Sequence, residues 1–248
     1  MVVIKTPQEI EEIYITAQIA KKVMERTLGW IHPGLTTANI DKFVYSQLRA
    51  LHAKSSFMGE GGYKYSTCIS INEEVVHGVP GARKVKKGDV LSLDLGALFG
   101  GWKSDMCRTI VVGQEPNPTV QKFLQAGQLA LDKAISVIAP KKFVGDISCT
   151  MQKTVEDAGY NVIRDLTGHA IGKELHEDPF IPCFGKCGTG PELICGMVLC
   201  IEAMFVAGSP QLVIAKDNWT VKTKDGKLSA MFEDMVAVTK EGYRILTR

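Results

Sequence analysis

Apolar residues recur with a helical period in several stretches of the chain, and capping residues mark where the first helix begins. Between residues 10 and 20 the apolar positions fall on one helical face. We expect this helix to begin at Pro7, with Thr6 as its N-cap and Glu9 completing a capping box. Gly29 is the expected stop.

The same period predicts three further helices. One follows Thr37, one opens at Pro118, and one has Asp146 as its N-cap and Gly159 as its stop. Strands are expected at the short apolar run TCISI and at the later runs LCIEAMF and SAMFEDMVAV.

A predicted β-hairpin, LSLDLGALFGGWKSDMCRT at residues 91–109, combines alternation with a glycine pair. A turn at residues 99–100 places Asp94 directly opposite Asp105. A turn at residues 100–101 shifts the register by two and keeps both on one face. Because like charges facing each other destabilise a ladder, these two carboxylates need a further source of stabilisation.

Two more carboxylates lie in apolar strand contexts, Glu202 and Glu233. Four buried carboxylates cannot all be ionised without a counter-charge, since an unpaired buried charge costs several kcal/mol. Arg and Lys are sparse in these strands. We therefore expect a pair of divalent cations, and oxygen-rich ligands favour Mn²⁺ or Fe²⁺ over zinc.

Three of the five histidines have glycines nearby, which indicates close backbone approach at a site: His77, His169 and His176. His32 lies in a loop and His52 near a helix end, where a structural or surface role suffices.

The second part of the chain repeats the pattern of the first. GDVLSLD at 88–94 corresponds to GMVLCIE at 196–202, and other anchors follow in the same order at nearly the same offset. This predicts an internal duplication with halves of about 1–115 and 116–248, which superposes the carboxylates that end the two segments. Chance similarity between apolar strands is the alternative.

Composition is that of an ordinary globular protein: 248 residues, 45% hydrophobic, 23% charged and a net charge of +2. No basic run supports a dedicated nucleic-acid surface, and no apolar run is long enough to span a membrane. The first residues do not have the pattern of a signal peptide. Seven cysteines without a CxxC pair favour free, mostly buried thiols in a reducing compartment.

The motifs INEEVVHGVPG, GDVLSLDLG, TGHAIGKELHEDP and NWTVKTKDGKLSAMFED, taken in order, resemble type I methionine aminopeptidases of family M24 over essentially the whole chain. The resemblance implies an α/β pita-bread (creatinase/aminopeptidase) fold, with two pseudo-symmetric halves, an antiparallel sheet and outer helices. It implies one catalytic domain over 1–248, as in bacterial-style enzymes without an N-terminal extension. An organellar form is the alternative origin.

The resemblance also implies the ligands of two divalent ions (Fe²⁺, Mn²⁺, Co²⁺ or similar). By the resemblance, Asp105 and Glu233 bridge both ions. Asp94 binds the first ion, and His169 and Glu202 bind the second.

The catalytic roles that the resemblance implies fall to three residues. Glu202 is the general base, His176 stabilises the oxyanion, and His77 hydrogen-bonds the substrate amide near the leaving nitrogen.

An apolar pocket for the methionine side chain is expected from Tyr63, Cys68 and Trp219, and a monovalent-cation site from Asn72 and Ser229. The expected partners are peptide or nascent-chain N-termini that begin with Met and carry a small second residue. We also expect a cytoplasmic monomer that associates with ribosomes.

The chain departs from the family pattern at four positions near these motifs, Ala170, Leu175, Ala203 and Asp234. None removes a ligand. Two other functions compete: a non-enzymatic pita-bread binding protein, which would lack ligands, and an X-Pro peptidase, which usually carries an additional N-terminal domain. Type II methionine aminopeptidases carry a long insertion that is absent here.

Overall fold

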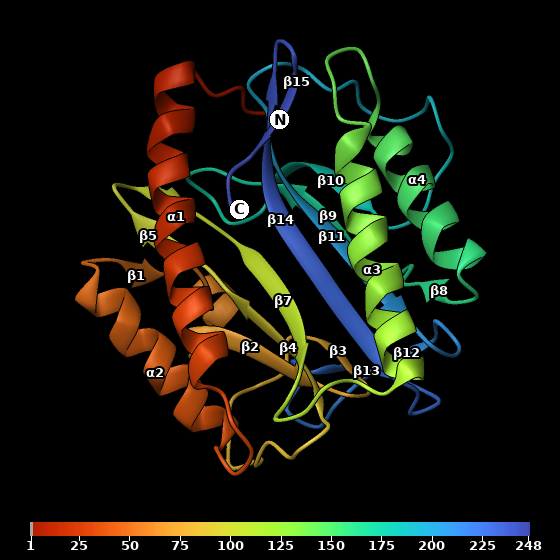
Figure 1. Ribbon diagram of the computed structural model, residues 1–248. Coiled ribbons are helices and arrows are strands. Elements are labelled where there is room, and N and C mark those ends of the chain that lie inside the picture. Colours follow the sequence, from red (N-terminus) through yellow and green to blue (C-terminus); the bar gives the residue numbers. More distant parts are fainter. Residues whose placement is uncertain (1) are drawn as a thin grey trace.

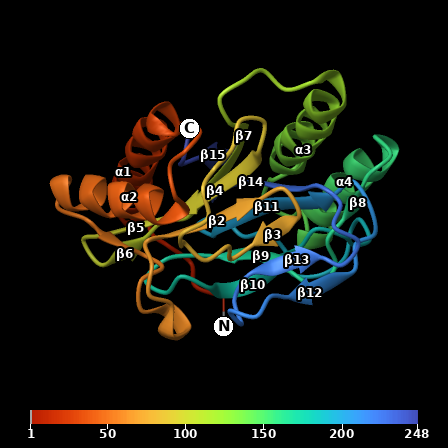
Figure 2. The ribbon, with the colours of Figure 1, turned by 90° about the horizontal axis from the view of Figure 1, so that it is seen from below.

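In the computed structural model, which describes residues 2–248, four α-helices cover one face of a long antiparallel sheet (Figure 1). The helices form two pairs, and Figure 2 shows both pairs on the same side of the strands. Their bounds are Pro7–Trp30 for α1, Thr37–Ala50 for α2, Pro118–Ser136 for α3 and Val144–Asp157 for α4. No helix within the described range is both long and apolar enough to cross a membrane.

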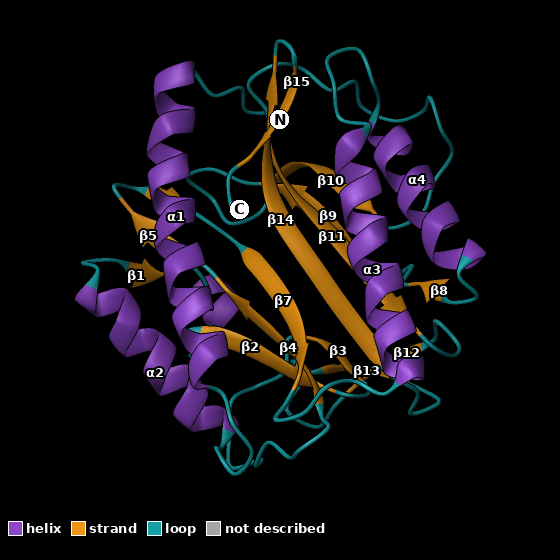
Figure 3. Ribbon diagram, in the orientation of Figure 1, coloured by secondary structure: helices purple, strands orange, loops and turns teal. Residues whose placement is uncertain are grey.

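The central sheet runs in the order β10-β9-β11-β14-β7-β4-β2, with β15 beside β14 and β8 beside β11 (Figure 3). Its strands are β2 (Thr67–Ile71), β4 (Val90–Leu95), β7 (Met106–Val111), β8 (Asn161–Val162), β9 (Thr167–Ala170), β10 (Glu177–Pro182), β11 (Val198–Val206), β14 (Ser229–Thr239) and β15 (Gly242–Ile245). The two central strands β11 and β14 are buried along almost their whole length. Helix α3 packs on one face, and the strand at Glu74–Val76 (β3) contacts β14 as well.

Two three-stranded sheets flank the central one. β1, β5 and β6 form the first, and β12, β13 and β3 form the second. Figure 2 shows the second small sheet on the side of the central sheet away from the helices. The bounds are Lys54–Ser55 (β1), Glu74–Val76 (β3), Ala97–Phe99 (β5), Trp102–Lys103 (β6), Leu212–Ile214 (β12) and Val221–Thr223 (β13), and a short 3₁₀ turn covers Glu60–Gly62.

The predicted cap of α1 is confirmed. The Glu9 backbone N–H donates to the Thr6 hydroxyl at 3.2 Å, and the Thr6 N–H donates to the Glu9 carboxylate at 2.8 Å. α2 begins one residue earlier than predicted, because Thr36 is the N-cap and accepts the N–H of Asn39. α3 opens at Pro118, as predicted.

The prediction that Asp146 caps α4 is wrong. The helix begins at Val144, because carbonyl groups of the loop after β10 accept the N–H groups of Val144 and Gly145 and replace a polar cap. Asp146 occupies the third helical position, where its carboxylate accepts the N–H groups of Phe143 and Gly188, both at 2.8 Å.

The hairpin has the register of the second predicted alternative. Phe99 pairs with Trp102 around a Gly100–Gly101 turn, and both glycines have positive φ angles, 60° and 86°, which a side chain would oppose. Asp94 is therefore opposite Cys107 rather than opposite Asp105, and direct opposition of the two aspartates is wrong.

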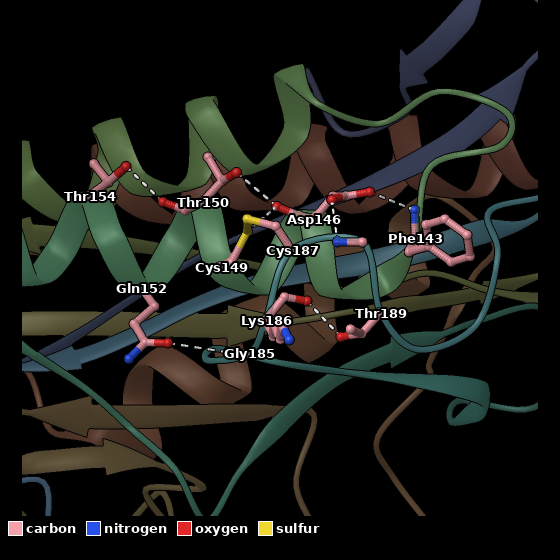
Figure 4. The surroundings of a disulfide bond; sticks show 11 residues. Phe143, Asp146, Cys149, Thr150, Gln152, Thr154, Gly185, Lys186, Cys187 and Thr189 are labelled. Atoms are coloured by element: carbon pink, nitrogen blue, oxygen red, sulfur yellow. Dashed lines mark hydrogen bonds between the residues drawn. A yellow bond between two sulfur atoms is a disulfide. The ribbon is translucent and has the colours of Figure 1, made fainter.

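The prediction of free thiols is wrong for two of the seven cysteines. Cys149 of α4 and Cys187 of the loop between β10 and β11 form a disulfide, with a Cα–Cα distance of 5.5 Å (Figure 4). Within the described chain the other five are free, and only Cys195 of these is exposed. Hydrogen bonds from Gly185 to Gln152 and from Gly188 to Asp146 join the same loop to α4.

Candidate metal centre and active site

Aligned positions of four strands form one row of the central sheet that holds three of the predicted carboxylates, with the fourth, Asp105, beside it. Glu202 of β11 is aligned with Glu233 of β14, and Glu233 is aligned with Cys107 of β7. Cys107 in turn faces Asp94 of β4, and Asp105 comes just before β7. Because aligned residues of antiparallel strands lie side by side, the row gathers the carboxylates, and all four line a cavity of about 270 Å³.

His169 presents a nitrogen lone pair to this cluster. Its Nδ1 lies 3.0 Å from the carbonyl oxygen of Ala170, which can only accept, so Nδ1 carries the proton and Nε2 does not. Nε2 lies 3.5 Å from Glu202 Oε1 and 3.9 Å from Asp105 Oδ2. Burial, together with the nearby His176, lowers the pKa of His169 to about 3, so the ring is a neutral ligand and not an ion-pair partner.

The charges of the carboxylates are poorly compensated by the protein. Burial raises the pKa of Asp94 to about 7, and burial with mutual repulsion raises the pKa values of Asp105, Glu202 and Glu233 well above their ordinary range. Among residues 2–248, one oxygen each of Asp94, Asp105 and Glu233 is buried without a hydrogen-bond partner. Such atoms are almost always paired, so these oxygens and the imidazole lone pair fit hard divalent cations as their missing partners.

Sequence reasoning missed Cys200, which lies at the same centre. Its sulfur and ligand atoms of Asp105, His169 and Glu233 are all within 4.8 Å of one another. Burial and the adjacent carboxylates raise the pKa of the Cys200 thiol, which keeps its proton and hydrogen-bonds Glu233. The available signal was strand alternation, because Cys200 precedes Glu202 by two residues and shares its face.

The two other predicted histidines line the same cavity. The rings of His176 and His169 are 4.5 Å apart in an edge-to-face arrangement. His77 has a positive φ of 57°, and a Cβ on the next residue, Gly78, would lie 2.1 Å from the carbonyl oxygen of Ile69. This glycine therefore allows the close backbone approach expected beside His77. Both residues keep solvent-exposed surface, and partial desolvation by the surrounding protein lowers their pKa values, which favours neutral rings.

An apolar compartment adjoins the ligand cluster. Tyr63, Cys68 and Trp219 all line the cavity, and the Tyr63 and Trp219 rings meet edge to face with centroids 4.9 Å apart. The Tyr63 hydroxyl donates to the Thr67 carbonyl at 2.8 Å, which fixes the ring. Leu175, one of the departures from the family pattern, is a further wall residue.

Asn72 and Ser229 are brought together, outside the residues that line the cavity. The Ser229 hydroxyl donates to the carbonyl oxygens of Asn72 and Glu74 at 3.0 and 2.9 Å. The Asn72 side chain bonds Asp89 and the N–H of Val90. The two residues therefore form an oxygen-rich corner at the ends of β2 and β14.

Asp234 points away from the cavity, as alternation predicts. It is fully buried and accepts hydrogen bonds from Arg108, Thr247 and Arg248 on the helix side of the sheet. Its negative charge is thus paired with Arg108 and Arg248, although it still contributes to the raised pKa of the neighbouring Glu233.

Fold and centre together define a class, the metal-dependent peptidases, and comparison with known proteins agrees. Residues 11–240 match the model of metallopeptidase family M24. The chain is 39% identical over 248 residues to methionine aminopeptidase 1 of Bacillus subtilis and 36% identical to methionine aminopeptidase of Escherichia coli, covering 100% and 93% of those proteins.

Solved structures give the same result. The crystal structure of methionine aminopeptidase from Thermotoga maritima is 42% identical, with a TM-score of 0.97 and full coverage of both chains. Prolidase from Pyrococcus furiosus is 26% identical, with a TM-score of 0.82, and the chain spans 65% of its length. The chain belongs to metallopeptidase family M24 and, within it, to the methionine aminopeptidases with the pita-bread fold.

Proposed function

We propose that this chain is a metal-dependent aminopeptidase that removes the N-terminal methionine from peptides and nascent proteins, preferring a small second residue. The observation that carries the proposal is the cavity itself, where an uncompensated carboxylate–imidazole cluster adjoins an apolar compartment. Relatives that are 36–39% identical to this chain over nearly its whole length bear the name methionine aminopeptidase, which supports the same substrate.

Two divalent cations would be held by Asp94, Asp105, His169, Glu202 and Glu233. When bound, such cations polarise a carbonyl and make water a nucleophile near neutral pH. Mn²⁺, Fe²⁺ and Co²⁺ are the ions that we propose, because the donor set is dominated by oxygen.

The protein's own groups would then divide the remaining work. A Glu202 oxygen accepts the proton of the attacking water and passes it to the leaving nitrogen. His176 donates a hydrogen bond to the oxygen that becomes negative, and His77 holds the amide of the scissile bond. Both rings are neutral, so each can donate from one nitrogen at neutral pH.

The compartment of Tyr63, Cys68 and Trp219 would receive the methionine side chain. Its aromatic edges and low polarity suit a thioether, which packs favourably against rings. We also propose that the carbonyl groups near Asn72 and the Ser229 hydroxyl bind one monovalent cation, since they converge at one corner.

We further propose one catalytic domain over 1–248 with two related halves, about 1–115 and 116–248. The protein would act as a cytoplasmic monomer near the ribosome, where nascent N-termini emerge. X-Pro hydrolysis, the alternative, is not favoured, because the chain spans only 65% of the prolidase and matches methionine aminopeptidases over their full length.

The test uses protein stripped of metal with a chelator and then given Mn²⁺, Fe²⁺ or Co²⁺ stepwise. We expect no cleavage of a Met-Ala peptide without metal, restored cleavage with at least one ion, and none of an Ala-Pro peptide. Glu202→Gln is the control for contaminating peptidase, because it should stay inactive with every ion. If the wild-type protein cleaves the Met-Ala peptide with none of these ions, the proposed enzymatic activity is ruled out.

A further inference from the structure

The least regular seam of the central sheet, between β7 and β14, runs directly through the candidate metal centre. In the described chain β4 and β7 share six aligned pairs and β11 and β14 share nine, whereas β7 and β14 share one, Cys107 with Glu233. This seam separates Asp94 and Asp105 on one side from Glu202 and Glu233 on the other. The spacing of the ligands across it therefore depends on something other than a regular ladder.

One guanidinium group bridges the seam at that single pair. Arg108 Nη1 donates to the backbone carbonyl oxygens of Cys107 at 2.9 Å and Glu233 at 2.5 Å. Its Nη2 donates to Asp234 Oδ1 at 2.5 Å. A rigid, planar donor thus fixes both backbones beside the Glu233 ligand, which a flexible ammonium would do less well.

Asp234 is the counter-charge that keeps this guanidinium in place. It is fully buried, and its two oxygens are saturated by Arg108, by the Thr247 hydroxyl and by Arg248 Nε, the last two at 2.7 Å. The Thr247 hydroxyl in turn accepts the backbone N–H of Met235 at 3.1 Å. The segment after β15 is therefore part of the same arrangement, on the helix side of the sheet.

We propose that Arg108 and Asp234 form a positioning pair that sets the separation of the two halves of the metal-binding cluster. The inference rests on the proposed function, because it requires that the cluster binds divalent cations. Neither residue lines the cavity, so both act through the Glu233 backbone and not on substrate. Loss of groups that orient metal ligands typically lowers metal affinity by about 10- to 100-fold.

Two variants separate positioning from mere stability. Arg108→Lys keeps the charge and loses the fork that reaches two carbonyls, and Asp234→Asn keeps the shape and loses the counter-charge. Arg244→Lys is the matched control, because Arg244 pairs with Glu11 at the surface, away from the seam. Mn²⁺ affinity is measured by calorimetry and by chelator competition, and unfolding of the metal-free forms by urea titration.

We expect both seam variants to bind Mn²⁺ about 10- to 100-fold more weakly than wild type, with Arg244→Lys unchanged. Chelator competition in excess Mn²⁺ gives the affinity of a variant that does not fold without metal. Seam variants that bind Mn²⁺ within twofold of wild type, even with a lower urea midpoint, would reduce the pair to a structural role and overturn the proposal. A wild-type protein that binds no divalent cation would overturn the proposed function as well.

Discussion

Replacing Asp94 by asparagine should make the metal-free protein more stable while abolishing its response to metal. Asp94 is half-buried, and its Oδ1 is enclosed without a hydrogen-bond partner in the described structure. Burial raises its pKa from 3.8 to about 7, so the ionised form is disfavoured in the folded chain. Asparagine has nearly the same shape and is neutral at every pH.

The sign and size follow from proton linkage. With the folded pKa above the unfolded one, the folded protein binds more protons between pH 3.8 and about 7, and stability from this group falls as pH rises through that window. Above the window the loss is up to about 4 kcal/mol. Metal-free Asp94→Asn should therefore gain up to about 4 kcal/mol at pH 8, less than half of that at pH 5 and almost nothing near pH 4.

The assay is urea unfolding of chelator-treated protein at these three pH values, with circular dichroism as the signal. Exposed Asp165 provides the control Asp165→Asn, which should change stability little at any pH. Added Mn²⁺ should stabilise the wild type and leave Asp94→Asn unchanged. An Asp94→Asn protein that is no more stable than wild type at pH 8, or that gains as much at pH 4 as at pH 8, would contradict the role of burial at this carboxylate.

Three further predictions concern the cavity histidines, the pH dependence of metal binding and the disulfide. His77→Ala and His176→Ala should each lower kcat/KM by about 10²–10⁴-fold with Mn²⁺ affinity nearly unchanged, because they would contact substrate and not metal; equal losses of affinity and rate would contradict this. Metal binding should release protons and strengthen as pH rises through 7, since the cavity carboxylates must ionise; calorimetry in two buffers of different ionisation enthalpy checks it. Reducing the Cys149–Cys187 disulfide, which spans 38 residues, should lower the free energy of unfolding in urea by up to about 4 kcal/mol. Dithiothreitol should leave the free energy of unfolding of Cys149→Ser unchanged.

Features that depend on near neighbours in the sequence were predictable. The Thr6–Glu9 capping box involves residues three apart, and β2 is the TCISI run with its predicted bounds. The α4 cap was not predictable, because the carbonyl group that accepts the Val144 N–H belongs to a loop more than 40 residues later in the sequence. Local signals cannot predict a cap supplied by distant backbone.

The candidate site followed a similar division. The sequence alone indicated which carboxylates to consider, because a charged residue within an apolar strand, such as Glu233, is costly without a partner. Their mutual alignment was not, because a shift of two residues in the hairpin is allowed by the same alternation. The Cys149–Cys187 contact and the Arg108–Asp234 pair are equally long-range, and strand pattern alone does not predict which distant side chains meet.

The row of carboxylates also couples the fold of this protein to its metals. A cation that binds only the folded chain stabilises it by about 2.7 kcal/mol at a concentration a hundred times its Kd. That is comparable with the loss of up to about 4 kcal/mol expected from Asp94 alone above pH 8. Since β7 and β14 share a single aligned pair at this point, the cost of ionising the enclosed carboxylates falls where the ladder is least regular. Bound cations would offset that cost from the cavity side, while Arg108 joins the same two strands from the helix side.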